Sequence, residues 1–426
     1  MEQQSVLVFA YYFPPMGLSG VQRVSKFVKY LPENGWRPHV ITTGPIAYYA
    51  HDTSLLDDLD GRDVVIHRTS GSDPNSLLKG KGTVKMPREW MRKIMRAVSD
   101  TLFIPDNKRG WAKQALALAR ELVKEHHFDA IFVSGPPFST MMAAATLSEE
   151  TGIPLVVDYR DLWYGNQFHF YATPWHAHRH QALEHDVLIH ASRVTVTNRK
   201  LKERLIATYN HLNFEDVVII PHGFDPADIP PTLPAQRHDG PFRLTYTGIF
   251  YDVVTPIPFF KAVRKVLAER KDITLELHFA GLLRDEYVKA AKKLELTDII
   301  HNHGYCAHAE SVQLLLESDA LWMMVGNTRN ADTISSAKLY EYMGTRKPLL
   351  VSVPNGALRK DADRYGASWI TEPDDVDAIA TCIIEMVDAW RKGLLPTPDE
   401  AVVQSFDRRM LTASLAKQLA MATKVV

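Results

Sequence analysis

Residues 332–344 have the sequence Asp-Thr-Ile-Ser-Ser-Ala-Lys-Leu-Tyr-Glu-Tyr-Met-Gly, and an apolar run at 349–353 follows them. This order predicts a loop, a short helix and then a buried strand. The first turn of a helix has unpaired backbone N–H groups and a positive dipole, so it favours an anion. Lys338 adds a full positive charge there, and Ser335 and Ser336 add two hydroxyl groups.

Glu341 follows Lys338 by three positions, so both side chains lie on roughly one face of the predicted helix. A carboxylate behind an anion site can accept two hydrogen bonds from a sugar diol. A phosphate site followed by a ribose site is the layout of a nucleotide-binding site. The same residues also fit an ordinary capped helix with a solvated Lys–Glu pair, and the spacing alone leaves both interpretations open.

Apolar strands alternate with helical patterns along both halves of the chain, beginning with the strand at 6–13. This alternation is typical of an α/β fold with doubly wound sheets. A proline-rich polar segment at 226–241 predicts a linker between two domains. We therefore expect one Rossmann-like domain at 1–230 and a second at 231–404. A final helix at 405–426 is expected to return to the first domain.

Several predicted strands end in glycine, hydroxyl or charged residues. The carboxyl ends of parallel strands are where open α/β sheets bind ligands, and glycine lets backbone approach a ligand closely. Plain turns, and a simple Arg160–Asp161 ion pair, are the alternative interpretations. The residues at these ends are Gly17, Ser19, Gly20, Ser139, Arg160, Asp161, Gly248, Gly304 and Tyr305.

Four motifs together resemble the signatures of GT-B glycosyltransferases, family 4 in particular, of bacterial surface-polysaccharide pathways. They are Ser-Ala-Lys-Leu-Tyr-Glu-Tyr-Met-Gly at 336–344, Tyr-Tyr-Phe-Pro-Pro-x-Gly-x-Ser-Gly at 11–20, Asp-x-Arg-Asp-x-Trp at 158–163 and Ile-Pro-His-Gly-x-Asp at 220–225. The resemblance spans almost the whole chain and implies the GT-B fold, in which two Rossmann-like domains face a cleft.

The resemblance further implies transfer of a sugar from a nucleotide-sugar donor to a glycan or lipid-linked acceptor, with retention of configuration. No metal and no cofactor besides the co-substrate are expected. The implied catalytic residues are Lys338, Glu341 and Asp161. The implied donor-binding residues are Gly20, Gly248, Gly304, Tyr305, Ser335, Ser336, Lys338, Leu339 and Glu341. The implied acceptor-binding residues are Gly17, Ser19, Ser139, Arg160 and Asp161.

The chain departs from the family pattern at two places. The family has two glutamates eight positions apart, and this chain has Thr333 at the first position, with Asp332 beside it. The family also has basic residues soon after the glycine that corresponds to Gly248, and residues 252–256 contain none. Two alternatives therefore stay open: a non-hydrolysing nucleotide-sugar epimerase, which shares the fold, and a non-catalytic module that binds sugar-nucleotides or glycans.

Composition limits the class of protein and its compartment. A formal net charge of −1 over 426 residues argues against a nucleic-acid partner. Two cysteines exclude a disulfide framework and indicate a reducing compartment. The first residues lack a basic stretch, and the apolar run that follows is too short for a signal peptide or a spanning helix. We expect a cytoplasmic protein, and a location at the inner face of the cell membrane stays open.

Residues 79–98 combine seven basic side chains with apolar residues at helical spacing, among them Trp90, Met91, Ile94 and Met95. Such a basic amphipathic helix is typical of contact with an anionic membrane. A surface helix that packs its apolar stripe on its own domain fits equally well.

Five histidines at 169, 176, 178, 180 and 185 admit a zinc site. Their spacing lacks the usual companion ligands, which favours a polar rim on the acceptor side.

Overall fold

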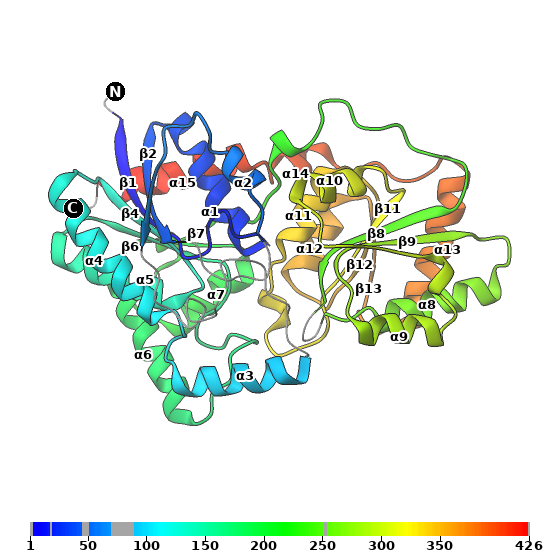
Figure 1. Cartoon of the computed structure of the whole chain (residues 1–426), viewed down its shortest axis with the longest axis horizontal. Helices are drawn as coiled ribbons and strands as arrows, with labels where there is room; N and C mark the ends of the chain where they lie inside the picture. The colour runs from blue at the N-terminus through cyan, green and yellow to red at the C-terminus, as the bar shows by residue number, and fades with distance from the viewer. Residues whose placement is uncertain (1–2, 18, 45–50, 70–88, 251–253, 425–426) are drawn as a thin grey trace. The chain divides into compact units, whose positions relative to one another are not determined.

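The computed structural model describes residues 3–17, 19–44, 51–69, 89–250 and 254–424. It divides into two compact units (Figure 1): unit 1 comprises Met1–Pro221 and Arg408–Val426, and unit 2 comprises His222–Asp407. The division falls before the predicted boundary at 230. Phe224 explains the difference, because its N–H donates to the carbonyl of Phe406 (3.1 Å) and its ring packs in the core of unit 2.

Unit 1 contains a seven-stranded sheet of order β3-β2-β1-β4-β5-β6-β7, in which each pair of neighbours is parallel. Its strands are β1 (Gln4–Phe9), β2 (Trp36–Thr43), β3 (Val65–Thr69), β4 (Ala130–Gly135), β5 (Leu155–Tyr159), β6 (Ala191–Val196) and β7 (Val217–Ile219). Its helices are α1 (Ser19–Tyr30), α2 (Ser54–Asp57), α3 (Glu89–Leu102), α4 (Arg109–Glu125), α5 (Phe138–Thr151), α6 (Pro174–His190), α7 (Arg199–Thr208) and α15 (Arg408–Ala422).

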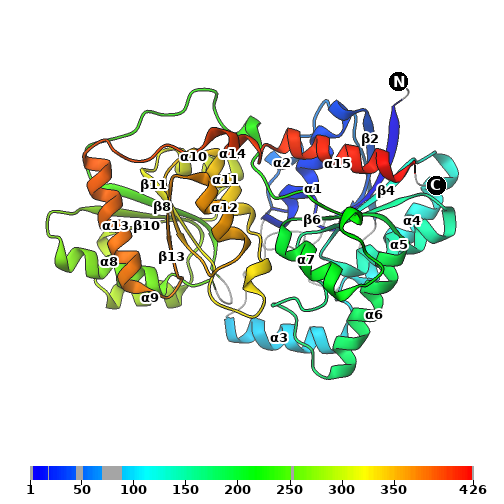
Figure 2. The ribbon, with the colours of Figure 1, turned by 180° about the vertical axis from the view of Figure 1, so that it is seen from behind.

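The central strands of unit 1 have buried apolar residues on both faces because helices cover both. Leu7 and Phe9 of β1 point into a core shared with α4 and α5, whereas Val6 and Val8 point into a core shared with α1 and α15. Alternate residues of a strand face opposite sides of the sheet, so a continuous apolar run is what this burial requires. Figure 2 shows α15 alongside α1, so the last helix belongs to unit 1.

Unit 2 contains a six-stranded parallel sheet of order β10-β9-β8-β11-β12-β13. Its strands are β8 (Phe242–Ile249), β9 (Leu275–Leu282), β10 (Ile300–Gly304), β11 (Ala320–Met324), β12 (Leu349–Ser352) and β13 (Ser368–Thr371). Its helices are α8 (Ile257–Glu269), α9 (Asp285–Lys293), α10 (His308–Leu316), α11 (Ala337–Gly344), α12 (Ala357–Tyr365), α13 (Val376–Arg391) and α14 (Glu400–Gln404).

The central strand β11 shows how unit 2 is layered. Trp322 and Met324 lie in the core shared with α8 and α13, and Leu321 and Met323 lie in the core shared with α10, α11 and α12. The predicted α/β class with two doubly wound, Rossmann-like domains is confirmed.

Two strands were missed by the sequence analysis, and both are edge strands. β10 reads Ile-His-Asn-His-Gly and has three exposed residues, and β13 is only partly buried at three of its four positions. An edge strand is covered less than a central one, so neither has the apolar run by which the central strands were recognised.

Candidate active site

At the end of β8, two glycines allow backbone and side-chain atoms of neighbouring elements to approach closely. Gly248 has φ +120° and pairs in register with Gly281 of β9. A Cβ at Gly281 would lie 2.1 Å from the carbonyl oxygen of Gly248, and a Cβ at Gly248 would lie 2.8 Å from Nζ of Lys338. A side chain at Gly281 would clash with backbone, and one at Gly248 would displace the ammonium group of Lys338, which lies close to the backbone at the strand end.

Lys338, on the first turn of α11, is partly buried and lacks a counter-ion in contact. Its Nζ lies 3.8 Å from the centroid of the Tyr246 ring, a cation–π contact. In the described part of the chain it forms neither an ion pair nor a hydrogen bond. Burial lowers the pKa of Lys338 to about 7, and the nearby charge of Glu341 opposes this shift. An anion that binds beside a partly buried ammonium group stabilises its positive charge.

The two serines before α11 have different environments. Ser335 is buried, and its hydroxyl lies 3.3 Å from the hydroxyl of Tyr340, which donates to Asp361 (2.8 Å). Ser336 occupies the N-cap position but does not cap the helix with its side chain. Ser336 is therefore the serine whose hydroxyl remains available to a ligand at the helix start.

Thr333 stands where the resemblance has a glutamate, and it is buried. Its hydroxyl donates to the carbonyl of Asn330 (2.8 Å). Asp332 is partly exposed and packs against Gly356, where a Cβ would lie 2.5 Å from the Cα of Asp332. Of these two neighbours, Asp332 is therefore the one that can reach a ligand.

Glu341 belongs to a chain of ionisable side chains, Glu341, His308 and Asp228, that the sequence did not reveal. Nδ1 of His308 lies 3.5 Å from the carboxylate of Glu341, and Nε2 of His308 lies 2.8 Å from the carboxylate of Asp228. Glu341 is 21% exposed and His308 is 12% exposed. His308 is the first residue of α10 and is distant in sequence from Glu341 and Asp228. No local sequence pattern therefore predicts its contacts with them.

A further hydrogen bond fixes α11 to the strand end. The N–H of Thr247 on β8 donates to the hydroxyl of Tyr342 on α11 (2.7 Å), and both residues are buried. This bond satisfies a backbone donor at the end of the strand. It holds Lys338, one turn earlier, over Gly248.

The other predicted donor residues have mixed placements. Gly304 has φ +69° at the end of β10, and Tyr305 after it is half exposed. The side chain of Leu339 is fully buried in the core, and its N–H donates to the carbonyl of Ser336. The side chain of Leu339 therefore supports the packing of the helix, and its assignment to the donor site stays a prediction. Gly20 lies in α1 of unit 1.

Arg160, after β5 in unit 1, organises two loops. Its guanidinium donates to the carbonyls of Gly20 and Pro136. Within the described ranges it forms no direct ion-pair contact with Asp161, although the charges of the two side chains act on each other. Asp161 is partly exposed, and burial raises its pKa.

Ser139 is engaged within the protein. Its N–H and its hydroxyl both contact the carboxylate of Asp106, at 2.9 and 2.6 Å, so Asp106 caps α5. Asp106 was not predicted, because it lies in a distant loop. Gly17 is buried, and the side chain of Ser19 lies outside the described residues.

The histidines at 169–185 are engaged in local contacts. Nδ1 of His180 accepts from the indole of Trp163 (3.0 Å), and Nδ1 of His176 lies 2.8 Å from the hydroxyl of Thr173. Burial lowers the pKa of His169 to about 3 and that of His180 to about 4. Some groups of described residues bring three possible metal-ligand atoms close together, but these groups do not include the histidines at 169–185.

Comparison with known proteins identifies the fold. Residues 19–223 match the family model described as a glycosyl transferase 4-like domain, almost wholly within unit 1. No curated protein matches the sequence. Among solved structures, sucrose-phosphate synthase from Thermosynechococcus elongatus is 13% identical, with a TM-score of 0.67 over 99% of this chain and 100% of that one.

Two further solved structures share this fold. HepE from Anabaena, solved in complex with UDP-glucose, is 14% identical, with a TM-score of 0.57 over 98% of this chain and 99% of that one. A proposed UDP-N-acetylglucosamine 2-epimerase from Listeria monocytogenes is 11% identical, with a TM-score of 0.56 over 97% and 95%.

The fold is thus GT-B, and the resemblance to GT-B glycosyltransferases of family 4 is confirmed. The family match thus identifies a glycosyl transferase 4-like domain at residues 19–223, and the structural neighbours share the fold of the whole chain.

Proposed function

We propose that this protein transfers a sugar from a nucleoside-diphosphate sugar, bound by unit 2, to a glycan or lipid-linked acceptor bound by unit 1. The transfer is proposed to retain the anomeric configuration and to need no metal. The observation that carries the proposal is the partly buried ammonium group of Lys338 at the start of α11, which has no ion-pair or hydrogen-bond partner in contact among the described residues, with only Glu341 as a nearby opposite charge. A diphosphate supplies the missing negative charge.

The positions of Lys338 and Ser336 fit a diphosphate. Both lie at the first turn of α11, where unpaired N–H groups and the helix dipole favour an anion. Negative charge on the diphosphate grows as the bond to the sugar breaks. Lys338 would therefore stabilise the transition state more than the bound donor, which is how a metal-free site accelerates departure.

Glu341 is proposed to bind the donor ribose. Its carboxylate is partly exposed one turn beyond Lys338, and His308 lies against it at 3.5 Å. His308 in turn contacts Asp228 at 2.8 Å, which limits its rotation. The sugar itself is proposed to contact Asp332, because Thr333 is buried.

Asp161 is the proposed acceptor-side group. It is partly exposed, it forms no hydrogen bond with the described residues, and its pKa is raised by burial. A carboxylate with a raised pKa is a better base, so Asp161 is suited to accept a proton from an acceptor hydroxyl.

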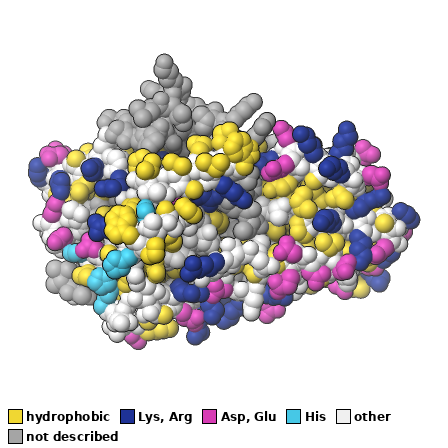
Figure 3. Space-filling view, turned by 90° about the horizontal axis from the view of Figure 1, so that it is seen from below, with side chains coloured by type: hydrophobic (Ala, Val, Ile, Leu, Met, Phe, Trp, Pro, Cys, Tyr) yellow, Lys and Arg dark blue, Asp and Glu magenta, His cyan; other side chains and the backbone are white. Residues whose placement is uncertain are grey.

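The exposure of α3 favours a membrane-bound acceptor. Trp90, Ile94 and Leu102 are 59%, 57% and 69% exposed. The polar side of the helix faces its own domain, since Arg96 donates to the carbonyl of Phe168 and Asp100 accepts from the N–H of Phe170. The apolar stripe therefore does not pack on unit 1. In the view from below, hydrophobic side chains and Lys or Arg side chains are interspersed (Figure 3).

We therefore propose that α3 holds the protein at an anionic membrane surface, where a lipid-linked acceptor is found. The part of residues 79–98 before α3 lies outside the described residues. Among the described helices, none is both long enough and apolar enough to cross a bilayer.

A screen of nucleoside-diphosphate sugars by thermal shift tests the proposal, followed by turnover of the donor that binds, with and without EDTA. We expect stabilisation by one nucleotide class and release of nucleoside diphosphate that EDTA does not abolish. Conversion of the donor to its epimer without acceptor would instead favour the epimerase alternative, which one structural neighbour represents. Binding without any turnover would favour a non-catalytic module.

A further inference from the structure

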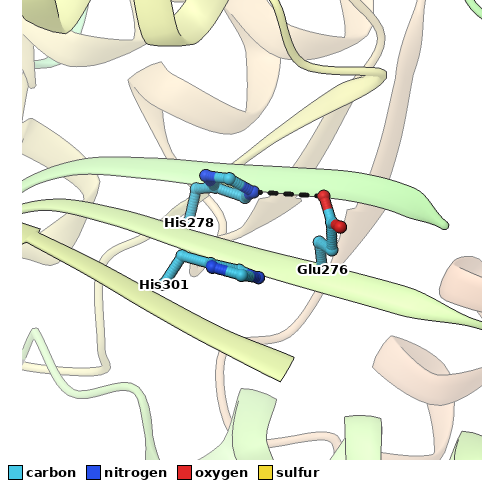
Figure 4. A group of neighbouring side chains, drawn as sticks. All are labelled: Glu276, His278 and His301. Atoms are coloured by element: carbon cyan, nitrogen blue, oxygen red, sulfur yellow. Dashed lines mark hydrogen bonds and ion pairs between the residues drawn. The ribbon is translucent and has the colours of Figure 1, made fainter. Parts of the chain in front are cut away.

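Glu276, His278 and His301 form a cluster on two neighbouring strands of unit 2 (Figure 4). His278 of β9 and His301 of β10 are paired in register, and Glu276 precedes His278 by two positions. Residues two apart on a strand share a face, so all three side chains lie on one side of the sheet. The backbone of the sheet thus fixes their Cβ positions.

The ligand atoms of the three side chains converge. The imidazoles of His278 and His301 are stacked, with centroids 4.6 Å apart and planes 21° apart. Nε2 of His278 lies 3.4 Å from Oε2 of Glu276. One ligand atom of each residue lies within 4.8 Å of the other two. Figure 4 shows one nitrogen of each ring at the end that faces the carboxylate.

A fourth residue, His303, orients the central ligand. Its Nε2 lies 2.9 Å from Nδ1 of His278. When the Nδ1–H of His278 donates to His303, the lone pair on Nε2 points toward Glu276. Metal-binding histidines are commonly oriented in this way, by a hydrogen bond from the nitrogen that does not bind the metal.

Arg243 is the one nearby cation in contact with the cluster among the described residues. Its Nε donates to Oε2 of Glu276 at 3.1 Å, the same oxygen that His278 approaches. Oε1 of Glu276 has no contact of this kind with the described residues, so it remains available. The guanidinium opposes a bound cation, which makes the two histidines the principal ligands.

We infer that Glu276, His278 and His301 form a site for a divalent transition-metal ion of the Zn²⁺ type. Two imidazoles and one carboxylate are a ligand set that Zn²⁺ uses, whereas Mg²⁺ and Ca²⁺ prefer oxygen ligands alone. Zn–N distances of about 2.0–2.1 Å require the ligand atoms to move closer together, which the exposed side chain of His301 allows. The ion would join the edge strand β10 to β9.

Calorimetric titration of the full chain with ZnCl₂ tests this inference, with MgCl₂ as the comparison ion. We expect one Zn²⁺ per chain, a rise in Tm with Zn²⁺ and no comparable response to Mg²⁺. His301→Ala is expected to weaken Zn²⁺ binding at least about tenfold and to abolish the rise in Tm. His178→Ala, a change at an exposed histidine in unit 1, and Lys338→Met are expected to bind Zn²⁺ as the wild type does.

Because His301 is exposed, loss of folding in the variant is not expected, and a circular dichroism spectrum checks this. Glu276→Gln provides a second variant and should also weaken Zn²⁺ binding. If the wild type does not bind Zn²⁺ stoichiometrically, the cluster is only a hydrogen-bonded histidine stack, and the inference is overturned. Equal affinity in the wild type and in both variants would also overturn it, because the ion would then bind elsewhere.

Discussion

At the scale of single residues, Lys338 decides how the proposed donor site responds to pH. Its pKa is lowered to about 7 in the unliganded protein, chiefly by burial. A bound diphosphate favours the charged form and raises this pKa again. Above pH 7, binding must therefore take up a proton.

The affinity for a nucleoside diphosphate is accordingly expected to fall as pH rises above 7, by up to about tenfold per pH unit for one linked proton. Calorimetry at several pH values, in buffers with different ionisation enthalpies, measures both the slope and the proton uptake. Lys338→Met should bind more weakly, with a flat profile. Lys292→Met, at an exposed lysine of α9, should keep the wild-type slope. An equal slope in Lys338→Met would assign the linked proton to another group.

Glu341 is expected to contribute to nucleotide affinity through hydrogen bonds to the ribose. Glu341→Ala should weaken binding by about 1–3 kcal/mol, the range for hydrogen bonds to a charged group. Glu286→Ala, at an exposed position of α9, is the matched control and should bind normally. Unchanged affinity in Glu341→Ala would remove this residue from the site.

Gly248 tests the close approach of Lys338 to the end of β8. Gly248→Ala forces a non-glycine residue to φ +120° and places Cβ 2.8 Å from Nζ of Lys338. Gly240→Ala introduces strain at φ +78° but meets no atom within 4 Å. Thermal unfolding should show a loss of about 1–3 kcal/mol in both variants. Only Gly248→Ala should lose nucleotide affinity, and normal binding by this variant would contradict the geometry described for Lys338.

At the scale of elements, α3 shows both the use and the limit of sequence patterns. Its sequence predicted an amphipathic helix and left open which way the apolar stripe points. The structure exposes the stripe, because Arg96 and Asp100 on the polar side bind the segment that includes Phe168 and Phe170. That segment lies about seventy residues away in sequence, so no local pattern could reveal the orientation.

Flotation with lipid vesicles tests the membrane proposal for α3. Each basic residue near an anionic leaflet is worth about 1 kcal/mol, and the buried apolar side chains add to this. Wild type should float with anionic vesicles at low salt and not with neutral ones. Trp90→Ser/Ile94→Ser and Arg92→Gln/Lys93→Gln should both remain in the soluble fraction. Leu394→Ser, a change at an equally exposed apolar residue of unit 2, should float. If wild type does not float, a soluble acceptor becomes the better proposal.

The sequence predicted the strands that helices cover on both faces of the sheet. The central strands β1 and β11 have runs of buried apolar residues, Val6 to Phe9 and Ala320 to Met324, because helices lie on both sides of their sheets. Edge strands β10 and β13 lack this signal, and the domain division at Pro221 depends on the packing of Phe224.

The nearness of Lys338 and Glu341 was predictable because both lie on one short helix. The contacts of His308, Asp228 and Asp106 were not, because only the tertiary fold brings these residues to their partners.

At the scale of the whole molecule, unit 2 is proposed to bind the donor and unit 1 is proposed to bind the acceptor. Unit 2 contains Gly248, Ser336, Lys338 and Glu341, which the structure brings together around the start of α11. Unit 1 contains Arg160, which ties two loops together, and the partly exposed Asp161 beside it. The proposed catalytic residues are divided between the two units, so the proposed transfer would need both.

The most direct test of the account is the steady-state turnover of the donor sugar by wild type and by Lys338→Met. The rate is measured as release of nucleoside diphosphate over a range of donor concentrations. We predict a lower kcat for Lys338→Met with a smaller change in KM, because the charge of Lys338 acts chiefly on the departing diphosphate. A variant with normal kcat and a raised KM would show that Lys338 only binds the donor, and would contradict its proposed role in the reaction.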